Sequence, residues 1–185
     1  MLAGDSLQCR GLDSLGKVDA VEETGETFLA NSMLKASAYA RLSGMWALAD
    51  DSGIAVDALE GKPGVHSARW AAIHNAGQGD QANNELLLRQ MDKVPDEKRT
   101  AQFVCVLSLA NPQGQIILTA RGEVAGRLLR KGAGKAGFGY DPLFYVDELG
   151  QTTAEVPAEL KHRISHRGQA LRRLKEMMAR TPLFT

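Results

Sequence analysis

Cysteine is scarce in this sequence: Cys9 and Cys105 are the only two among 185 residues. Two cysteines cannot supply a zinc site on their own, and their density is far below that of a small secreted scaffold held by disulfide bonds. Cys105 lies in the apolar run 103–109, which predicts a small core residue. The chemistry of this protein therefore has to come from other side chains.

Long hydrophobic runs and an excess of one charge are also missing. No apolar stretch approaches the ~20 residues that span a bilayer, and the N-terminus lacks a signal-peptide pattern, so we expect a cytoplasmic protein with no membrane partner. Lys+Arg and Asp+Glu both number 22, which argues against a general binder of nucleic acid. A local cluster of charge still suffices for a small anionic ligand.

The pattern of apolar residues predicts one α/β domain spanning residues 1–185. Apolar side chains three to four residues apart predict helices at 26–43, 80–93 and 166–180. Short apolar runs predict strands at 46–49, 54–59, 101–110, 115–120, 122–129 and 143–146. Because helices and strands alternate before a hairpin at 111–114, we expect a mixed twisted sheet flanked by helices, with two lobes and a central cleft.

An acidic segment, Asp50-Asp51-Ser52-Gly53, follows the apolar run 46–49. A strand that ends here delivers two adjacent carboxylates to the edge where open α/β sheets tend to bind ligands. Such carboxylates can hold Mg²⁺ or accept a proton from water. The alternative is a solvated turn, since these residue types favour turns for local hydrogen-bonding reasons.

Two further acidic residues, Glu22 and Glu23, lie ahead of the predicted helix 26–43. Either glutamate can join the acidic pair around one metal ion. The alternative is a charge that favours the helix N-terminus, worth only ~0.3–1 kcal/mol. Lys35 lies on the same helix, where a single lysine is usually only solvated.

Residues 131–142 are rich in glycine, and 132–137 match the G-x-G-x-x-G pattern of dinucleotide-binding loops. That motif must lead into a helix, whereas here Pro142 and the apolar residues after it favour a turn and a strand. The segment is not a phosphate-binding P-loop either, because Ala136 follows Lys135 where serine or threonine is required. We interpret it as either a flexible turn or a loop that lets backbone approach a ligand closely.

Aromatic and basic side chains follow this loop. Phe138 and Tyr140 offer a face on which a base can stack, an interaction worth ~1–3 kcal/mol. Lys161, His166 and Arg167 form a compact cationic group near a predicted helix start, where they can neutralise a triphosphate. The alternative for these three residues is an ordinary basic helix face.

Taken in order, these segments resemble the inosine triphosphate pyrophosphatase family, also called dITP/XTP or non-standard purine nucleoside triphosphate pyrophosphatases. The resemblance runs from about Glu22 to Glu176. It is carried by the strings at 22–28 (EETGETF), 31–36, 49–53 (ADDSG), 63–69 (PGVHSAR), 137–142 (GFGYDP) and 164–171 (ISHRGQAL).

The resemblance implies an enzyme that hydrolyses ITP, dITP and XTP to the monophosphate and pyrophosphate. By position, Asp51 would be the proton acceptor and a Mg²⁺ ligand, with Glu23 and Asp50 at the same metal. Phe138 would stack on the purine. The implied substrate-binding residues are Lys35, Ser52, Phe138, Gly139, Tyr140, Asp141, Lys161, His166 and Arg167. Family members are usually homodimers, so we expect a homodimer here.

The N-terminus departs from the family pattern. The family opens with a strand and a Ser/Thr-x-Asn-x-x-Lys loop that cradles the triphosphate, and this string is not found in the chain. We therefore expect an N-terminally short domain lacking that strand and its lysine. Removing one donor to the transition state typically costs ~10²–10³ in rate. Two alternatives to the enzyme stay open: a degenerate relative that binds purine nucleotides with weak or no turnover, and a pyrophosphatase for other modified or pyrimidine nucleotides.

Overall fold

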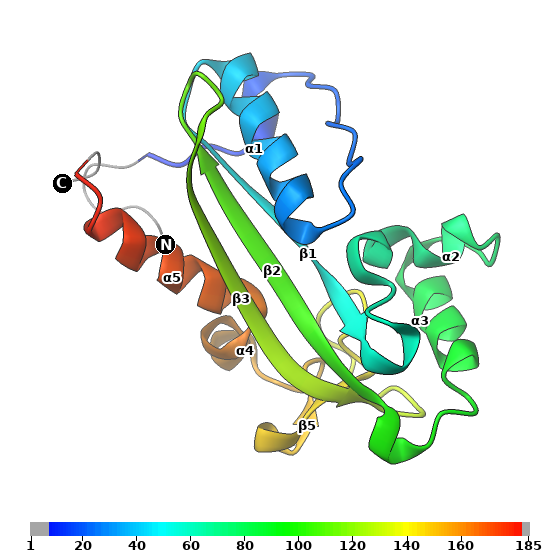
Figure 1. The fold of residues 1–185 in the computed structure, drawn as a ribbon. Helices are drawn as coiled ribbons and strands as arrows, with labels where there is room; N and C mark the ends of the chain where they lie inside the picture. Colours follow the sequence, from blue (N-terminus) through cyan, green and yellow to red (C-terminus); the bar gives the residue numbers. More distant parts are fainter. Residues whose placement is uncertain (1–7, 183–185) are drawn as a thin grey trace.

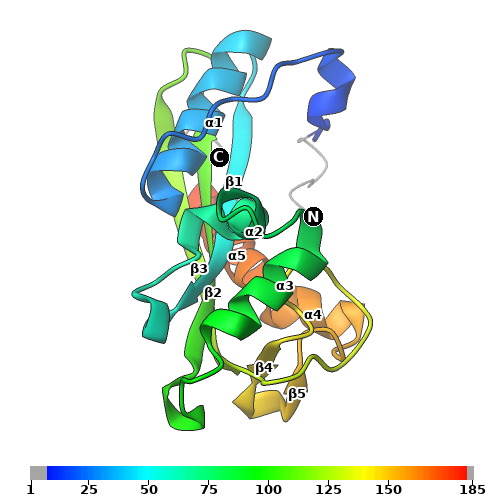
Figure 2. The same ribbon diagram turned by 90° about the vertical axis from the view of Figure 1, so that its right-hand side faces the viewer.

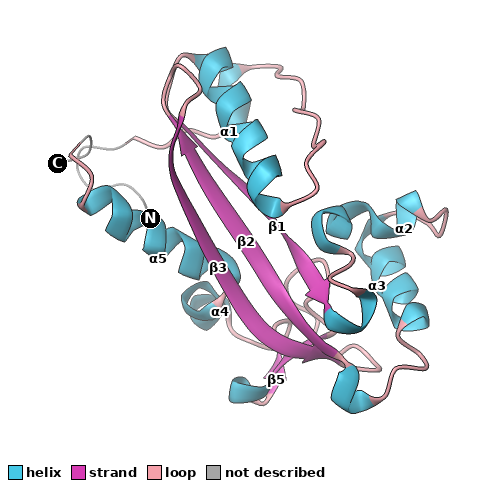
Figure 3. Ribbon diagram, viewed as in Figure 1, coloured by secondary structure: helices cyan, strands magenta, loops and turns pink. Residues whose placement is uncertain are grey.

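The computed structural model in Figure 1 describes residues 8–182. The strands are β1 (Ala47–Val56), β2 (Thr100–Ala110), β3 (Ile116–Leu128), β4 (Phe144–Val146) and β5 (Gln151–Thr152). The α-helices are α1 (Phe28–Ser43), α2 (Trp70–Ile73), α3 (Gly79–Gln90), α4 (Ala158–Ile164) and α5 (His166–Ala179). Short 3₁₀ helices lie at Leu12–Leu15, Asp57–Leu59, Gly64–Arg69, Asp96–Lys98 and Asp147–Leu149. The α/β class predicted from the sequence is confirmed (Figure 3).

The described strands form one sheet in the order β1-β2-β3-β4-β5, and each neighbouring pair is antiparallel. We expected a mixed sheet, so the described part differs in having no parallel pair. The long hairpin β2–β3 dominates the sheet and turns where predicted, at 111–114. Asn111 stabilises that turn because its Oδ1 accepts hydrogen bonds from the backbone N–H groups of Gln113 and Gln115.

Two predicted strand breaks are wrong. Strand β1 continues through Asp50-Asp51-Ser52-Gly53, where we expected the strand to end, and it pairs with β2 along its whole length. Strand β3 likewise continues through Gly122. In β1 the strand pairing outweighs the turn preference of these polar residues, a common outcome when tertiary contacts override local propensity.

Helix α1 covers one face of the sheet through small residues. Thr27 caps its N-terminus by accepting a hydrogen bond from the Ala30 N–H. Gly44 ends it in the left-handed conformation, as glycine readily does. Buried Ala36 and Ala40 face the sheet and allow the helix to approach it closely.

Helix α5 covers the opposite face. Cys105 is buried there against Ala170 and Leu174, which confirms it as a core residue. Opposite faces follow from the alternation of side chains along β2, where Cys105 contacts α5 and Ser108 bonds to α1. Ser165 caps α5 by accepting a hydrogen bond from the Gly168 N–H.

A second core lies at the other end of the hairpin, where α3, β4 and β5 pack (Figures 1 and 2). Its buried side chains include Ile54, Val56, Leu87, Met91, Phe103, Tyr140 and Phe144. The arrangement of one group of elements at each end of the hairpin agrees with the expected two lobes. None of the described helices combines the length and apolarity needed to cross a membrane.

Candidate functional site

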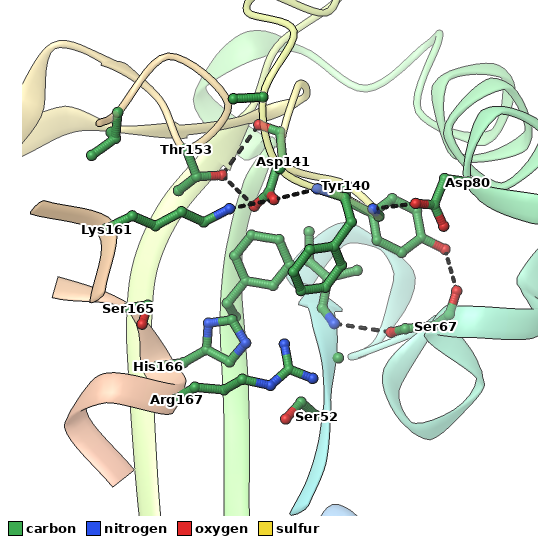
Figure 4. A pocket seen from close by; sticks show the side chains of 18 of the residues that line it. Ser52, Ser67, Asp80, Tyr140, Asp141, Thr153, Lys161, Ser165, His166 and Arg167 are labelled. Carbon is green, nitrogen blue, oxygen red and sulfur yellow. Dashed lines mark hydrogen bonds and ion pairs between the residues drawn. The ribbon is translucent and has the colours of Figure 1, made fainter. Parts of the chain in front are cut away.

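A cavity of about 420 Å³ lies between β1, the glycine-rich loop and the start of α5 (Figure 4). That volume is within the range of pockets that hold drug-sized ligands. Most of the residues predicted to bind substrate line it: Ser52, Phe138, Gly139, Tyr140, Asp141, Lys161, His166 and Arg167. Segments more than a hundred residues apart in the chain therefore meet in one cleft.

A lysine joins two of the predicted acidic residues on the α1 face of the sheet. Lys35 Nζ donates to Glu23 Oε1 at 2.6 Å and to Asp51 Oδ1 at 2.8 Å. Arg69 Nη1 donates to the other oxygen of Glu23, at 3.1 Å. This group of charged residues comes from three parts of the chain: Lys35 from helix α1, Asp51 from strand β1 and Glu23 from the segment before α1. Arg69 also belongs to the group, although no role was predicted for it from the sequence.

The pKa values of these carboxyl groups shift in opposite directions. Burial raises the pKa of Asp51, and its hydrogen bond to Lys35 offsets only part of that rise. Burial acts in the same sense on Glu23, but Lys35 and Arg69 together outweigh it and hold the pKa of Glu23 below its usual value. The surroundings therefore raise the pKa of Asp51 above that of an ordinary aspartate, which suits a proton acceptor, and lower the pKa of Glu23 below that of an ordinary glutamate.

Glu23 and Asp51 are the residues whose oxygen atoms would hold a divalent cation at this position. Asp51 Oδ2 is buried, and within the described chain it has no hydrogen-bond partner, although burying such an oxygen unpaired is costly. Carboxylate oxygens are the preferred ligands of Mg²⁺, and Lys35 already places a positive charge between the two residues. Within residues 8–182 no group of three or more His, Cys, Asp or Glu side chains converges on one point. A Mg²⁺ ion here would take water and substrate oxygens as its other ligands.

Asp50 points to the other face of the sheet. Its Oδ2 accepts from Arg167 Nε at 2.9 Å and from Ser52 Oγ at 2.8 Å. Burial raises the pKa of Asp50, but the charge of Arg167 and the hydrogen bond from Ser52 lower it by more. The pKa of Asp50 therefore lies below its usual value, and the side chain stays ionised. Since neighbouring residues on a strand face opposite ways, Asp50 lies apart from the Glu23–Asp51 pair, and its part in metal binding stays a prediction.

The aromatic side of the cavity is built around Phe138. This side chain is 64% exposed, and the cations of Lys161 and Arg167 lie 5.4 and 5.5 Å from its ring centroid. Buried Asp141 organises the loop, because it accepts from the Phe138 N–H at 2.8 Å and pairs with Lys161. An exposed ring flanked by two cations suits a planar, anionic ligand.

His166 completes the cavity wall in a neutral form. Its ring stacks on Phe103, with centroids 5.0 Å apart and planes 17° apart. Burial and the neighbouring charge of Arg167 lower the pKa of His166 to about 4. At neutral pH the imidazole therefore offers one N–H donor and one acceptor nitrogen to a ligand.

Other residues that shape the cleft were not predicted from the sequence. Ser67 Oγ accepts from the Ile54 N–H at 2.9 Å, and the Ser67 carbonyl accepts from Tyr140 Oη, also at 2.9 Å. Thr153 Oγ1 donates to Asp141 Oδ1 at 2.8 Å. Serine and threonine that act through such long-range hydrogen bonds leave no local pattern in the sequence.

An α/β fold with a linked carboxylate group on β1 and, beside that strand, an aromatic pocket flanked by cations is the arrangement that suits a small anionic ligand with a planar ring. Residues 1–177 match the Ham1 family, and the chain belongs to that family.

Relatives of known name share most of its length. A dITP/XTP pyrophosphatase of Geobacter sulfurreducens is 52% identical over 156 residues, which cover 84% of this chain and 76% of the relative. One from Corynebacterium glutamicum is 49% identical over 179 residues, covering 95% of this chain and 85% of the relative. The solved structure of the Staphylococcus aureus Ham1 protein superposes with a TM-score of 0.83 at 40% identity, covering 92% of this chain and 85% of that one.

Proposed function

We propose that this chain hydrolyses the non-standard purine nucleoside triphosphates ITP, dITP and XTP to the monophosphate and pyrophosphate. The observation that carries the proposal is an aromatic pocket flanked by cations, one of whose lining residues, Ser52, directly follows Asp51 on β1, where Lys35 joins Asp51 to Glu23. The names of relatives about half identical over most of the chain support the same substrates.

The proposed reaction is attack of water on the α-phosphorus. A bond forms between the water oxygen and the phosphorus, the bond to the bridging oxygen breaks, and pyrophosphate leaves. Asp51 orients the water and takes its proton, a role that its raised pKa favours. Lys35 lies beside it and offers positive charge to the phosphates. A Mg²⁺ ion held by Glu23 and Asp51 would polarise the phosphates and make the bound water more acidic.

Selectivity for a 6-oxo purine follows from the donors around the cavity. Lys161 and Arg167 carry N–H groups beside Phe138, and neither can accept a hydrogen bond. Facing the amino group of adenine, such donors stay unpaired, which can discriminate strongly between bases. We further propose that the protein acts in the cytoplasm as a homodimer.

Pyrophosphate release from ITP, XTP, ATP and GTP in the presence of Mg²⁺ tests the proposal. We expect ITP and XTP to be hydrolysed and ATP to be a poor substrate, whereas GTP, which also has a 6-oxo group, tests whether a 2-amino group is rejected as well. Equal rates with ITP and ATP would contradict the selectivity, and no release from any of the four would contradict the activity.

The neighbouring aspartates of β1 provide a matched pair of variants. Asp51→Asn removes the proton acceptor, so we expect kcat to fall by at least about 10²-fold with the fold intact. Asp50→Asn leaves Asp51 in place and weakens the contacts to Arg167 and Ser52, two residues that line the cavity, so we expect a rise in KM with kcat largely kept. The measurements are steady-state kinetics and circular dichroism. Retained turnover in Asp51→Asn would remove this residue from its proposed role.

A further inference from the structure

Gly139 is held at both of its peptide groups by one helix. Its N–H donates to Asp80 Oδ2 at 2.6 Å, and its carbonyl accepts from Asn84 Nδ2 at 2.8 Å. Asp80 and Asn84 lie four residues apart on α3 and so project from the same side of that helix. Figure 4 shows Asp80 reaching the loop from the side opposite Lys161 and Arg167.

These two hydrogen bonds fix the backbone that follows Phe138. The ring of Phe138 is largely exposed, so packing does little to hold it. Its position depends on the backbone of the loop, in which Gly139 adopts the left-handed conformation with a φ of 60°. The bonds at Gly139, together with the bond from the Phe138 N–H to Asp141, therefore restrict the backbone that carries the ring beside the cavity.

Helix α3 is itself a firm support for the loop. Asn83, between the two residues, is buried and bonds to the backbone at Ala71 and Ala68. Leu87, one turn further, is fully buried in the core that also contains Tyr140. The side-chain oxygen of Asn84 is buried and has no partner among the described residues, so the amide makes its one hydrogen bond to the loop.

We propose that Asp80 and Asn84 are positioning residues that hold the glycine-aromatic loop in the conformation needed to stack on the purine base. The inference deepens the proposed function, on which it rests. Neither residue needs to touch the phosphates or Asp51. They affect the binding of the base, which strengthens the binding of substrate and of transition state equally, so their loss should change KM and not kcat.

Steady-state kinetics with ITP is the first test. In Asp80→Ala and in Asn84→Ala we expect KM to rise about tenfold, the effect of losing one strong hydrogen bond, while kcat changes less than about twofold. Asp80→Asn should recover most of the wild-type KM, because an amide oxygen can still accept from the Gly139 N–H. Asn84→Asp should not recover, because it sets a carboxylate against the Gly139 carbonyl. Gln81→Ala is the matched control, since Gln81 is exposed on the same helix and bonds only to Glu85.

Two measurements separate this inference from the proposed function. Hydrogen exchange at the Gly139 amide requires no nucleotide, and we expect faster exchange in Asp80→Ala than in wild type or Asp80→Asn. Calorimetric binding of inosine monophosphate requires no turnover, and we expect about tenfold weaker binding in both alanine variants. A wild-type chain that binds the monophosphate but hydrolyses no triphosphate would contradict the proposed function and leave these two comparisons to decide the inference.

Three outcomes would overturn the inference. The first is that both alanine variants keep the KM and the affinity for inosine monophosphate of the wild type. The second is an equal loss in Asp80→Ala and Asp80→Asn, because the charge of Asp80 and not its hydrogen bond would then matter. The third is a wild-type chain that binds no purine nucleotide.

Discussion

At the scale of single residues, Lys35 links the acidic groups of the site. Its ammonium group is about as close to Glu23 as a hydrogen bond allows and reaches Asp51 from the same atom. Burial lowers the pKa of Lys35, but the two carboxylates together raise it above its ordinary value. The lysine therefore stays charged throughout the working pH range and keeps two acidic side chains together that would otherwise repel each other.

Replacing Lys35 should move the pH dependence of activity. Lys35 lowers the pKa of both Glu23 and Asp51, so in Lys35→Met both values rise. Since the reaction needs the ionised carboxylates, the acid limb of the kcat/KM profile should shift to higher pH, and kcat should fall about 10²-fold. Lys35→Arg keeps the charge and is the control. An acid limb that stays in place or moves to lower pH in Lys35→Met would show that these carboxylates do not set it.

His166 should contribute to the pH dependence of stability. Its pKa is about 4 in the folded protein, against ~6.5 for an unperturbed histidine, so the unfolded chain binds more protons between these values. Stability from this group is complete above pH ~6.5 and is lost as the pH falls towards the folded pKa. Urea unfolding at pH 7 and 4.5 should show wild type losing on the order of 2 kcal/mol more than His166→Gln. Equal losses in the two proteins would show that His166 is not held neutral by its surroundings.

At the scale of elements, the site depends on how closely α5 approaches β3. A side chain added at Gly122 would lie 2.1 Å from the His166 carbonyl oxygen and 2.4 Å from the Ala170 nitrogen. Both contacts are with helix backbone, which cannot rotate away as a side chain can. Gly122 therefore sets the distance between the sheet and the residues at the start of α5 that face the cavity.

The substitution Gly122→Ala should push α5 away from the sheet. We expect the free energy of unfolding to fall by about 1–3 kcal/mol and nucleotide affinity to fall with it, because His166 and Arg167 move. Gly11→Ala is the control, since a side chain there would meet only the flexible carboxylate of Asp13. Chemical denaturation and calorimetry measure the two effects. Unchanged stability in Gly122→Ala would show that the helix accommodates the methyl group.

The elements also show what the sequence can and cannot predict. The helix at 26–43 was predictable because its apolar spacing and Gly44 agree with its tertiary role. The end of the strand at Asp50 was predicted wrongly, because the pairing that keeps residues 50–53 in the strand comes from β2, about fifty residues further along the chain. The residues that line the cavity were recognised through a family resemblance. From local pattern alone, each segment had an ordinary structural interpretation as well, such as a solvated turn or a basic helix face.

At the scale of the whole molecule, a nucleotide in the cleft would contact both lobes at once. A ligand that binds only the folded state at 100 times its Kd stabilises that state by about 2.7 kcal/mol. We therefore expect inosine monophosphate to raise the melting temperature. Arg167→Ala should lose most of this shift, whereas Leu42→Ala, at an exposed site on α1, should keep it. A full shift in Arg167→Ala would contradict the placement of the ligand beside α5.

Along strand β1, consecutive side chains point to opposite faces of the sheet, so the position of each aspartate decides which helix it faces. Asp51 serves the α1 face and Asp50 the α5 face only because the strand pairs with β2 without interruption. A deletion that makes β1 slip by one residue against β2 would exchange the two aspartates between faces, and Lys35 and Arg167 would each meet the wrong partner. A change of one residue in length at this edge should therefore be far more damaging than most substitutions in the same strand.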